Sequence, residues 1–269
     1  LMDEIFARMG DDLDLLVLPE SVSFGSVSLD GSPNPDVDPA VQVDVRDWEV
    51  LLADIIGHHR TIVAVGTVAS LESRPYNSML FFTRGGLEGV YHKQELVPFA
   101  EHVPTWSSIL GVGGETDFSP GEDSAVIVVR GTAIGAFICQ EVLLPHTLRR
   151  SVLDGAEVLV TGGNDGVFAD PAVKQVHADH AQLRAVETGR YIVRAMKTGI
   201  SAIIDPTGRE LQRSGTDPTF LFAGVVPRIE LTPYVRFGDW VVWLSGLTVI
   251  GLAVEVRRGR GAVSSDQTD

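Results

Sequence analysis

The stretch Gly-Thr-Ala-Ile-Gly-Ala-Phe-Ile-Cys-Gln-Glu at residues 131–141 predicts a buried strand that ends at a cysteine. An apolar run that stops at a polar step places Cys139 at the carboxyl end of that strand. The amide groups of a following helix would favour a thiolate there, and a thiolate is a strong nucleophile. The alternative is that Cys139 is a small buried hydrophobic residue, because free cysteine is among the most buried residue types.

Strand and helix patterns alternate on both sides of this stretch, without an internal repeat, which favours one layered α/β or α+β domain. Residues 21–45 are rich in Ser, Gly, Pro and Asp and are expected to form a long loop. Helices are expected near residues 1–10, 48–59, 144–153 and 171–189, and strands at 15–18, 61–67, 76–82, 89–92, 125–129, 132–138, 158–161, 191–195, 201–204 and 220–226.

Composition sets broad limits on function. The chain has 269 residues, of which 44% are hydrophobic and 21% charged, which is ordinary for a globular protein with a full core. A net charge of −15 argues against a nucleic-acid partner, since phosphate binding needs basic surface. A single cysteine excludes an internal disulfide and a Cys-based zinc site.

The end of the chain differs in kind from the rest, because residues 240–254 carry no charge. Fifteen helical residues span about 22 Å, short of a hydrocarbon core of roughly 30 Å, so a buried core helix is the alternative interpretation. Trp240 and Trp243 at one end, with Arg257, Arg258 and Arg260 beyond the other, are typical of membrane interfaces and extend the effective span. We therefore expect a transmembrane helix, with its arginines in the cytoplasm and the main domain outside.

Three further charged residues stand in suggestive settings. Glu20 directly follows the predicted strand at 15–18, and Lys93 closes the strand at 89–92. Glu101 lies in a stretch with too many Pro and apolar residues for an ordinary solvent loop. Each taken singly reads as a surface charge. Together with Cys139, at the strand ends where α/β sites gather, they indicate an active site.

Several motifs resemble the nitrilase (carbon–nitrogen hydrolase) superfamily and, within it, the apolipoprotein N-acyltransferase family. They are Pro-Glu at 19–20, Tyr-His-Lys-x-x-Leu-Val-Pro-Phe-x-Glu-x-Val-Pro at 91–104 and Ile-Cys-x-Glu at 138–141. Gly-Gly-Asn-Asp at 162–165, Leu-Arg-Ala-Val-Glu-Thr-Gly-Arg at 183–190 and the run at 198–209 extend the match. The combined pattern covers nearly all of residues 11–256 and is highly specific, whereas any single motif is not.

The resemblance implies a nitrilase-like four-layer αββα sandwich over residues 1–230, a transmembrane helix at 240–256 and a cytoplasmic tail at 257–269. It implies that Glu20 is the general base, that Lys93 stabilises the oxyanion and that Cys139 is the nucleophile. Glu101 and Glu141 would support this triad. The location implied is the bacterial plasma membrane, with the catalytic domain on its extracytoplasmic face and the C-terminus in the cytoplasm.

The activity implied is transfer of an acyl chain from a phospholipid, through a thioester on Cys139, to the N-terminal amine of a diacylglyceryl-cysteine lipoprotein. One alternative is an amidase of the same superfamily, in which water replaces the amine. Another is a membrane-tethered binding domain without catalysis, in which Glu20, Lys93 and Cys139 would lie apart. No organic cofactor or metal is predicted. His177 and His180, three residues apart on one predicted helix, are expected on a solvated face.

One feature of the resemblance concerns the start of the chain. The family begins this domain with a core strand that follows a bundle of membrane helices, whereas this sequence starts within the first predicted helix. We therefore expect a fragment of a longer reading frame, and residues 1–269 alone to fold poorly or to lack activity.

Overall fold

The structure is a computed structural model that describes residues 13–20, 26–35, 37–38, 41–57, 59–102, 118–168, 170–215 and 219–265, with backbone only at 54, 55, 167 and 256–265. The helix predicted at residues 1–10 lies outside this part of the chain. The chain divides into two compact units, Leu1–Glu230 and Leu231–Asp269.

The first sheet of the larger unit is built around a long hairpin in the middle of the sheet. Its strands run in the order β3-β2-β4-β5-β6, and β1 pairs beside β2 along the same edge of β4. The strands are β1 (Leu15–Leu18), β2 (Ser26–Ser28), β3 (Gln42–Asp44), β4 (Ile62–Leu71), β5 (Arg74–Thr83) and β6 (Gly86–His92).

The long loop predicted for residues 21–45 is therefore partly wrong, because β2 and β3 lie within it. Both strands have only three residues and pair in parallel, β3 with β2 and β2 with β4. The ladder partners of β2 lie about forty residues away along the chain, at Val68, Ala69 and Ser70. Pairing of this kind depends on distant residues, so a local composition of Ser, Gly and Pro does not predict it.

The second sheet has the strand order β12-β11-β10-β9-β8-β7. Its strands are β7 (Val126–Val129), β8 (Thr132–Ile138), β9 (Val158–Gly163), β10 (Ile192–Met196), β11 (Ala202–Ile204) and β12 (Glu210–Arg213). The predicted strand at 220–226 is wrong, since no ladder forms there. The more polar segment β12 instead occupies the edge beside β11, because the tight turn after β11 brings it there.

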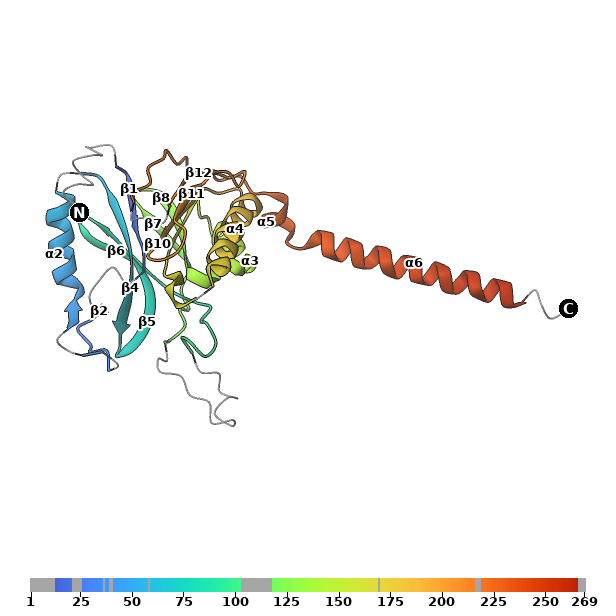
Figure 1. Cartoon of the computed structure of the whole chain (residues 1–269), viewed down its shortest axis with the longest axis horizontal. Helices are drawn as coiled ribbons and strands as arrows, with labels where there is room; N and C mark the ends of the chain where they lie inside the picture. Colours follow the sequence, from blue (N-terminus) through green and yellow to red (C-terminus); the bar gives the residue numbers. More distant parts are fainter. Residues whose placement is uncertain are drawn as a thin grey trace. The chain divides into compact units, whose positions relative to one another are not determined.

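The two sheets face each other and each carries helices on its outer side, so the unit has four layers (Figure 1). Between the sheets, Met79 and Phe81 of the first pack with Ile134, Ala136 and Val160 of the second. Helix α2 (Val45–Ile56) covers the other face of the first sheet, while α3 (Pro145–Leu153) and α4 (Pro171–Thr188) cover the second. The α/β sandwich expected from the sequence is thus confirmed.

Both long helices of this unit begin where the sequence supplies capping groups. The Asp44 side chain accepts a hydrogen bond from the backbone N–H of Arg46 at the start of α2. The Asp170 side chain accepts one from Ala172 N–H, with Pro171 in the first turn of α4. Helix α4 ends at Gly189, whose φ of 66° lies in the left-handed region that glycine adopts without strain.

The smaller unit consists of α5 (Pro233–Phe237) and α6 (Trp240–Ser265). Every side chain of α6 from Trp240 to Glu255 is exposed. Within the residues that the structure describes, no helix has both the length and the apolar character needed to cross a membrane.

Candidate active site

Four strands, β1, β6, β8 and β9, end on the same side of the sandwich, and each is followed by a polar residue. Strands β8, β9 and β10 pair in parallel, so the residues that follow β8 and β9 meet at one edge of the second sheet. In the first sheet β1 is parallel to β4, and β6 also runs parallel to β4, because each pairs antiparallel with β5. Glu20 follows β1, Lys93 follows β6, Cys139 follows β8 and Asn164 follows β9.

The backbone of Glu20 fits between two glycines. A Cβ atom at Gly66 on β4 would lie 2.8 Å from Glu20 Cα, and one at Gly162 on β9 would lie 3.3 Å from Glu20 N. Glycine at both positions lets the chain after β1 enter between the two sheets. Gly163, next along β9, approaches Cys139 in the same way, since its Cβ would lie 3.3 Å from Cys139 Cα.

The Glu20 carboxylate is held by a side-chain amide. Its Oε1 accepts a hydrogen bond from Asn77 Nδ2 at 2.9 Å. Burial raises the pKa of Glu20 above its usual value, and the positive charge of Lys93 partly opposes that rise. A carboxylate with a raised pKa is a stronger base once ionised.

Lys93 is almost fully buried, with 1% of its surface exposed, and its Nζ lies 2.5 Å from Glu101 Oε2. Glu101 also accepts hydrogen bonds from Asn77 Nδ2 at 3.0 Å and from the backbone N–H of Val97 at 2.9 Å. A buried ammonium needs a partner of opposite charge, and Glu101 provides it. Asn77 Nδ2 joins the two predicted glutamates, because it donates to both Glu20 and Glu101.

Cys139 begins the short 3₁₀ turn Cys139–Leu143 and has a positive φ of 50°. Positive φ is uncommon for residues other than glycine and costs of order 1–3 kcal/mol, so surrounding contacts must hold the turn. Burial raises the pKa of the Cys139 thiol to about 11, an effect that Lys93 opposes and that the charges of Glu20 and Asp165 reinforce. Burial therefore opposes the thiolate that helix amide groups would favour, so ionisation of Cys139 depends on a base such as the predicted Glu20.

Lys93 acts on both Glu20 and Cys139. Its positive charge lowers the pKa of the Glu20 carboxyl and of the Cys139 thiol, and the charge of Glu20 raises the pKa of the thiol. Among the residues predicted from the sequence, Glu101 is joined to Lys93 by an ion pair and to Glu20 through Asn77, while Cys139 interacts with Glu20 and Lys93 through their charges.

Glu141 is fully buried and organises the turn that carries Cys139. It accepts hydrogen bonds from the backbone N–H of Ile138 at 2.7 Å and from Tyr91 Oη at 2.8 and 2.9 Å. It also accepts from the backbone N–H groups of Gln94 and Glu95, at 2.9 and 3.1 Å. One carboxylate therefore ties the turn that carries Cys139 to the segment immediately after Lys93.

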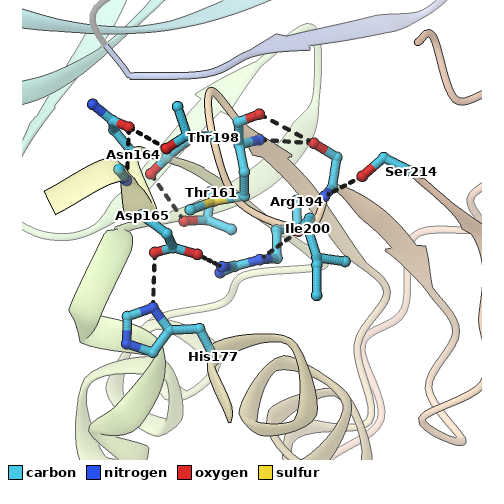
Figure 2. A network of polar contacts seen from close by, with 12 residues as sticks. Thr161, Asn164, Asp165, His177, Arg194, Thr198, Ile200 and Ser214 are labelled. Carbon is cyan, nitrogen blue, oxygen red and sulfur yellow. Dashed lines mark hydrogen bonds and ion pairs between the residues drawn. The ribbon is translucent and has the colours of Figure 1, made fainter. Parts of the chain in front are cut away.

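Behind the site, Asp165 forms a buried network with His177 of α4 and Arg194 of β10 (Figure 2). Asp165 Oδ1 lies 2.8 Å from His177 Nδ1, and Oδ2 lies 3.1 Å from Arg194 Nη2. His177 is 2% exposed, so the solvated face predicted for it is wrong. The spacing of two histidines could not reveal this burial, because the partners of His177 come from other elements.

Reasoning from the sequence missed the role of Asn77 and this network. A signal existed for Asn77, which is a polar residue within β5, just before the apolar stretch at residues 79–82. Among the described residues, no group of three or more His, Cys, Asp or Glu side chains is placed to hold a metal ion.

A four-layer sandwich with a buried cysteine, lysine and glutamates at its strand ends defines the class of protein. Residues 2–234 match the carbon-nitrogen hydrolase family, and the chain belongs to that family. Its sequence is similar to proteins named apolipoprotein N-acyltransferase. Those from Pseudomonas syringae pv. tomato and Azotobacter vinelandii are 34% and 35% identical to it over 68% and 70% of this chain.

A third relative of that name, from Mycolicibacterium smegmatis, is 30% identical over 84% of this chain. The chain spans about two fifths of the length of these relatives, with 37%, 37% and 40% of each covered. The matches therefore concern one part of those proteins.

Solved structures share the fold. A carbon-nitrogen hydrolase from Helicobacter pylori G27 superposes with a TM-score of 0.60 at 15% identity, covering 81% of this chain and 78% of the other. A mutant amidase from Nesterenkonia sp. AN1, with acrylamide added at its active-site cysteine, superposes with a TM-score of 0.62 at 17% identity, covering 91% and 89%. The nitrilase-like fold expected from the sequence is thus confirmed.

Proposed function

We propose that this chain carries the acyl-transfer site of an apolipoprotein N-acyltransferase, with Cys139 as nucleophile, Glu20 as general base and Lys93 as the oxyanion-stabilising cation. The observation that carries the proposal is the buried Lys93, which is paired with Glu101 and lowers the pKa of both Glu20 and Cys139, while Asn77 Nδ2 holds the Glu20 carboxylate beside Glu101. A nucleophile with a base and a fixed cation beside it is the arrangement that covalent acyl transfer needs.

In the first half-reaction Glu20 removes the thiol proton, and Cys139 Sγ attacks the ester carbonyl carbon of a phospholipid. Negative charge develops on the carbonyl oxygen, and the Lys93 ammonium stabilises it. The tetrahedral intermediate collapses as the carbon–oxygen bond breaks. The lysophospholipid alcohol leaves with the proton that Glu20 returns, and a thioester remains on Cys139.

In the second half-reaction the N-terminal amine of a diacylglyceryl-cysteine lipoprotein attacks the thioester carbon. Glu20 takes a proton from the amine and gives it to the departing sulfur, so the thiol is restored and an amide forms. Glu101 holds Lys93 in place throughout, and Glu141 holds the turn that presents Cys139.

We propose that α6 holds this site at the bacterial plasma membrane, with the domain on the extracytoplasmic face and the arginines of residues 257–260 in the cytoplasm. The support is a helix whose apolar side chains from Trp240 to Val254 are exposed on every face, since a soluble surface rarely leaves such a set uncovered. A lipid acyl donor requires a site at a bilayer, which this anchor would supply.

The second candidate function is hydrolysis of a small amide by the same thioester route, with water replacing the lipoprotein amine. It is favoured by the likeness in fold to the Nesterenkonia amidase, whose active-site cysteine accepts a covalent adduct. The first half-reaction is common to both candidates, so the acyl donor distinguishes them.

The test is mass spectrometry of the chain after incubation with vesicles of bacterial phospholipids. We expect the mass of Cys139 to rise by one fatty acyl group, and hydroxylamine to remove it, because hydroxylamine cleaves thioesters. The Cys139→Ser variant should show no hydroxylamine-sensitive adduct. An unlabelled Cys139 together with turnover of small amides would favour the amidase instead.

A further inference from the structure

A buried tyrosine, Tyr91, joins the two sheets next to the candidate site, and the proposed chemistry does not use it. Tyr91 lies on β6 with 1% of its surface exposed, and its side chain belongs to the core between the sheets. Its Oη donates to both carboxylate oxygens of Glu141, at 2.8 and 2.9 Å. Glu141 stands in the turn that follows β8, so these hydrogen bonds run from the first sheet to the second.

Tyr91 and Glu141 have matching positions relative to the proposed reacting residues. Tyr91 precedes Lys93 by two residues, and Glu141 follows Cys139 by two. The backbone N–H of Lys93 donates to Asn77 O at 2.8 Å, which continues the pairing of β6 with β5. Residues two apart along a strand point to the same face, so Tyr91 and Lys93 both face the inside of the sandwich. The contact between Tyr91 and Glu141 therefore connects the two segments that carry Lys93 and Cys139.

The other donors to Glu141 belong to the same two segments. Its Oε2 accepts from the backbone N–H of Ile138 at 2.7 Å, and its Oε1 accepts from the N–H groups of Gln94 and Glu95 at 2.9 and 3.1 Å. Because all three are main-chain groups, the placement of this carboxylate fixes the backbone beside Cys139 and beside Lys93. The Tyr91 hydroxyl contacts both oxygens and thus sets the direction in which the carboxylate faces.

The acid–base properties of the pair keep Tyr91 a donor and Glu141 an acceptor. Burial and the negative charge of Glu141 raise the pKa of Tyr91 well above its usual value, so the hydroxyl keeps its proton. Burial raises the pKa of Glu141, and the hydrogen bonds from Ile138, Glu95 and Tyr91 oppose that rise. Only the ionised carboxylate offers both oxygens as acceptors to this set of donors.

We propose that Tyr91 is a positioning residue whose hydroxyl, by orienting the Glu141 carboxylate, sets the placement of Lys93 relative to Cys139. This inference rests on the proposed roles of Lys93 and Cys139. Tyr91 acts through Glu141 and takes no part in proton transfer.

Tyr91→Phe removes the hydroxyl and keeps the ring that packs in the core. The positive charge of Lys93 lowers the pKa of the Cys139 thiol, so a wider separation of the two groups raises that pKa. The experiment measures alkylation of Cys139 by iodoacetamide against pH in the full chain, where the rate below the thiol pKa follows the thiolate fraction. We expect a pKa higher by about half a unit, which makes alkylation at pH 8 about threefold slower.

The direction of the change separates positioning from loss of structure. A loosened or unfolded chain would expose the buried Cys139 sulfur and speed its alkylation. The matched control is Tyr191→Phe, because Tyr191 also packs against the core between the sheets but precedes β10, at the opposite end of the sheet from Cys139. An unchanged or faster rate in Tyr91→Phe, or an equal change in both tyrosine variants, overturns the proposal.

A double-mutant cycle tests whether Tyr91 acts through Glu141. Glu141→Gln replaces one acceptor oxygen by an amide that cannot accept the backbone donors, and we expect it to slow alkylation at least threefold. Adding Tyr91→Phe to Glu141→Gln should slow alkylation no further, because the route from the hydroxyl to the main chain is already lost. Multiplied effects of the two substitutions would contradict the proposal. If circular dichroism shows that Glu141→Gln does not fold, Tyr91→Phe decides alone.

The parent site has its own check in the same assay. If Lys93→Gln leaves the alkylation profile of Cys139 unchanged, the charge of Lys93 does not act on the sulfur, and the proposed function fails together with this inference. If Lys93→Gln slows alkylation while Tyr91→Phe does not, only the positioning role of Tyr91 fails.

Discussion

At the scale of single residues, the chemistry depends on how burial changes two acid–base groups. Burial raises the pKa of the Cys139 thiol to about 11, which favours the protonated thiol at neutral pH. In the proposed mechanism Glu20, whose pKa burial also raises, removes that proton during the attack.

We predict that Glu20→Gln changes alkylation and acylation in opposite directions. The Glu20 charge raises the pKa of Cys139, so its removal lowers that pKa and should speed alkylation by iodoacetamide. Acylation by phospholipid should instead fall by at least about a hundredfold, because the general base is lost. Both rates are measured by mass spectrometry, with Glu72→Gln, an exposed glutamate, as the control. Parallel changes in the two rates would contradict the role of Glu20.

A second prediction concerns the pH at which the rate of Cys139 acylation begins to fall on the acidic side. Burial favours the neutral form of Glu20, so its folded-state pKa lies above 4.5. As the pH falls through that raised value, Glu20 gains a proton and acylation of Cys139 declines. The decline should therefore begin at a higher pH than an exposed glutamate would give, and it should be absent from the residual rate of Glu20→Gln.

At the scale of elements, glycines decide how closely the strands approach. Gly66 on β4 and Gly162 on β9 belong to different sheets, and both leave room for the backbone of Glu20. Glu20 thus reaches the second sheet because glycine has no side chain at either position. A carboxylate at the end of β1 would otherwise stay within the first sheet.

We predict that Gly66→Ala displaces Glu20 and impairs acylation more than folding. The new Cβ would lie 2.8 Å from Glu20 Cα, a backbone atom that cannot rotate away, so the free energy of unfolding should fall by about 1–3 kcal/mol. Urea unfolding measures the stability, and acyl-adduct formation on Cys139 measures the site. Gly224→Ala is the matched control, because a Cβ there meets nothing within 4 Å. Full acylation in Gly66→Ala would exclude this role for the glycine.

At the scale of the whole molecule, the chain combines an α/β sandwich whose apolar side chains are buried with the helix α6, whose apolar side chains are exposed. Among the described residues, the sandwich buries apolar side chains between the sheets and beneath α2. Helix α6 leaves its apolar side chains exposed, from Trp240 to Val254. A surface of that kind is suited to lipid, which is the basis for placing the proposed acyl donor beside this protein.

We predict that a charge on α6 weakens membrane binding. Val242→Glu puts a carboxylate among exposed apolar residues, and a charged residue in a membrane-inserted helix costs about 3 kcal/mol, roughly a hundredfold in partitioning. Flotation of the chain with phospholipid vesicles measures the bound fraction. Val50→Glu, at an exposed valine of α2, is the control and should leave binding unchanged. Equal losses in both variants would show that α6 is not the membrane contact.

The sequence by itself determined the family, the alternation of strands and helices, and the candidate residues Glu20, Lys93, Glu101, Cys139 and Glu141. Motif residues and hydrophobic periodicity are local, so they can be read along the chain. The tertiary structure decided three further features: β2 and β3 lie where a loop was expected, His177 is buried rather than solvated, and burial raises the pKa of Cys139. It also revealed the Asn77 side chain between Glu20 and Glu101, because hydrogen bonds and desolvation arise between residues that are distant in sequence.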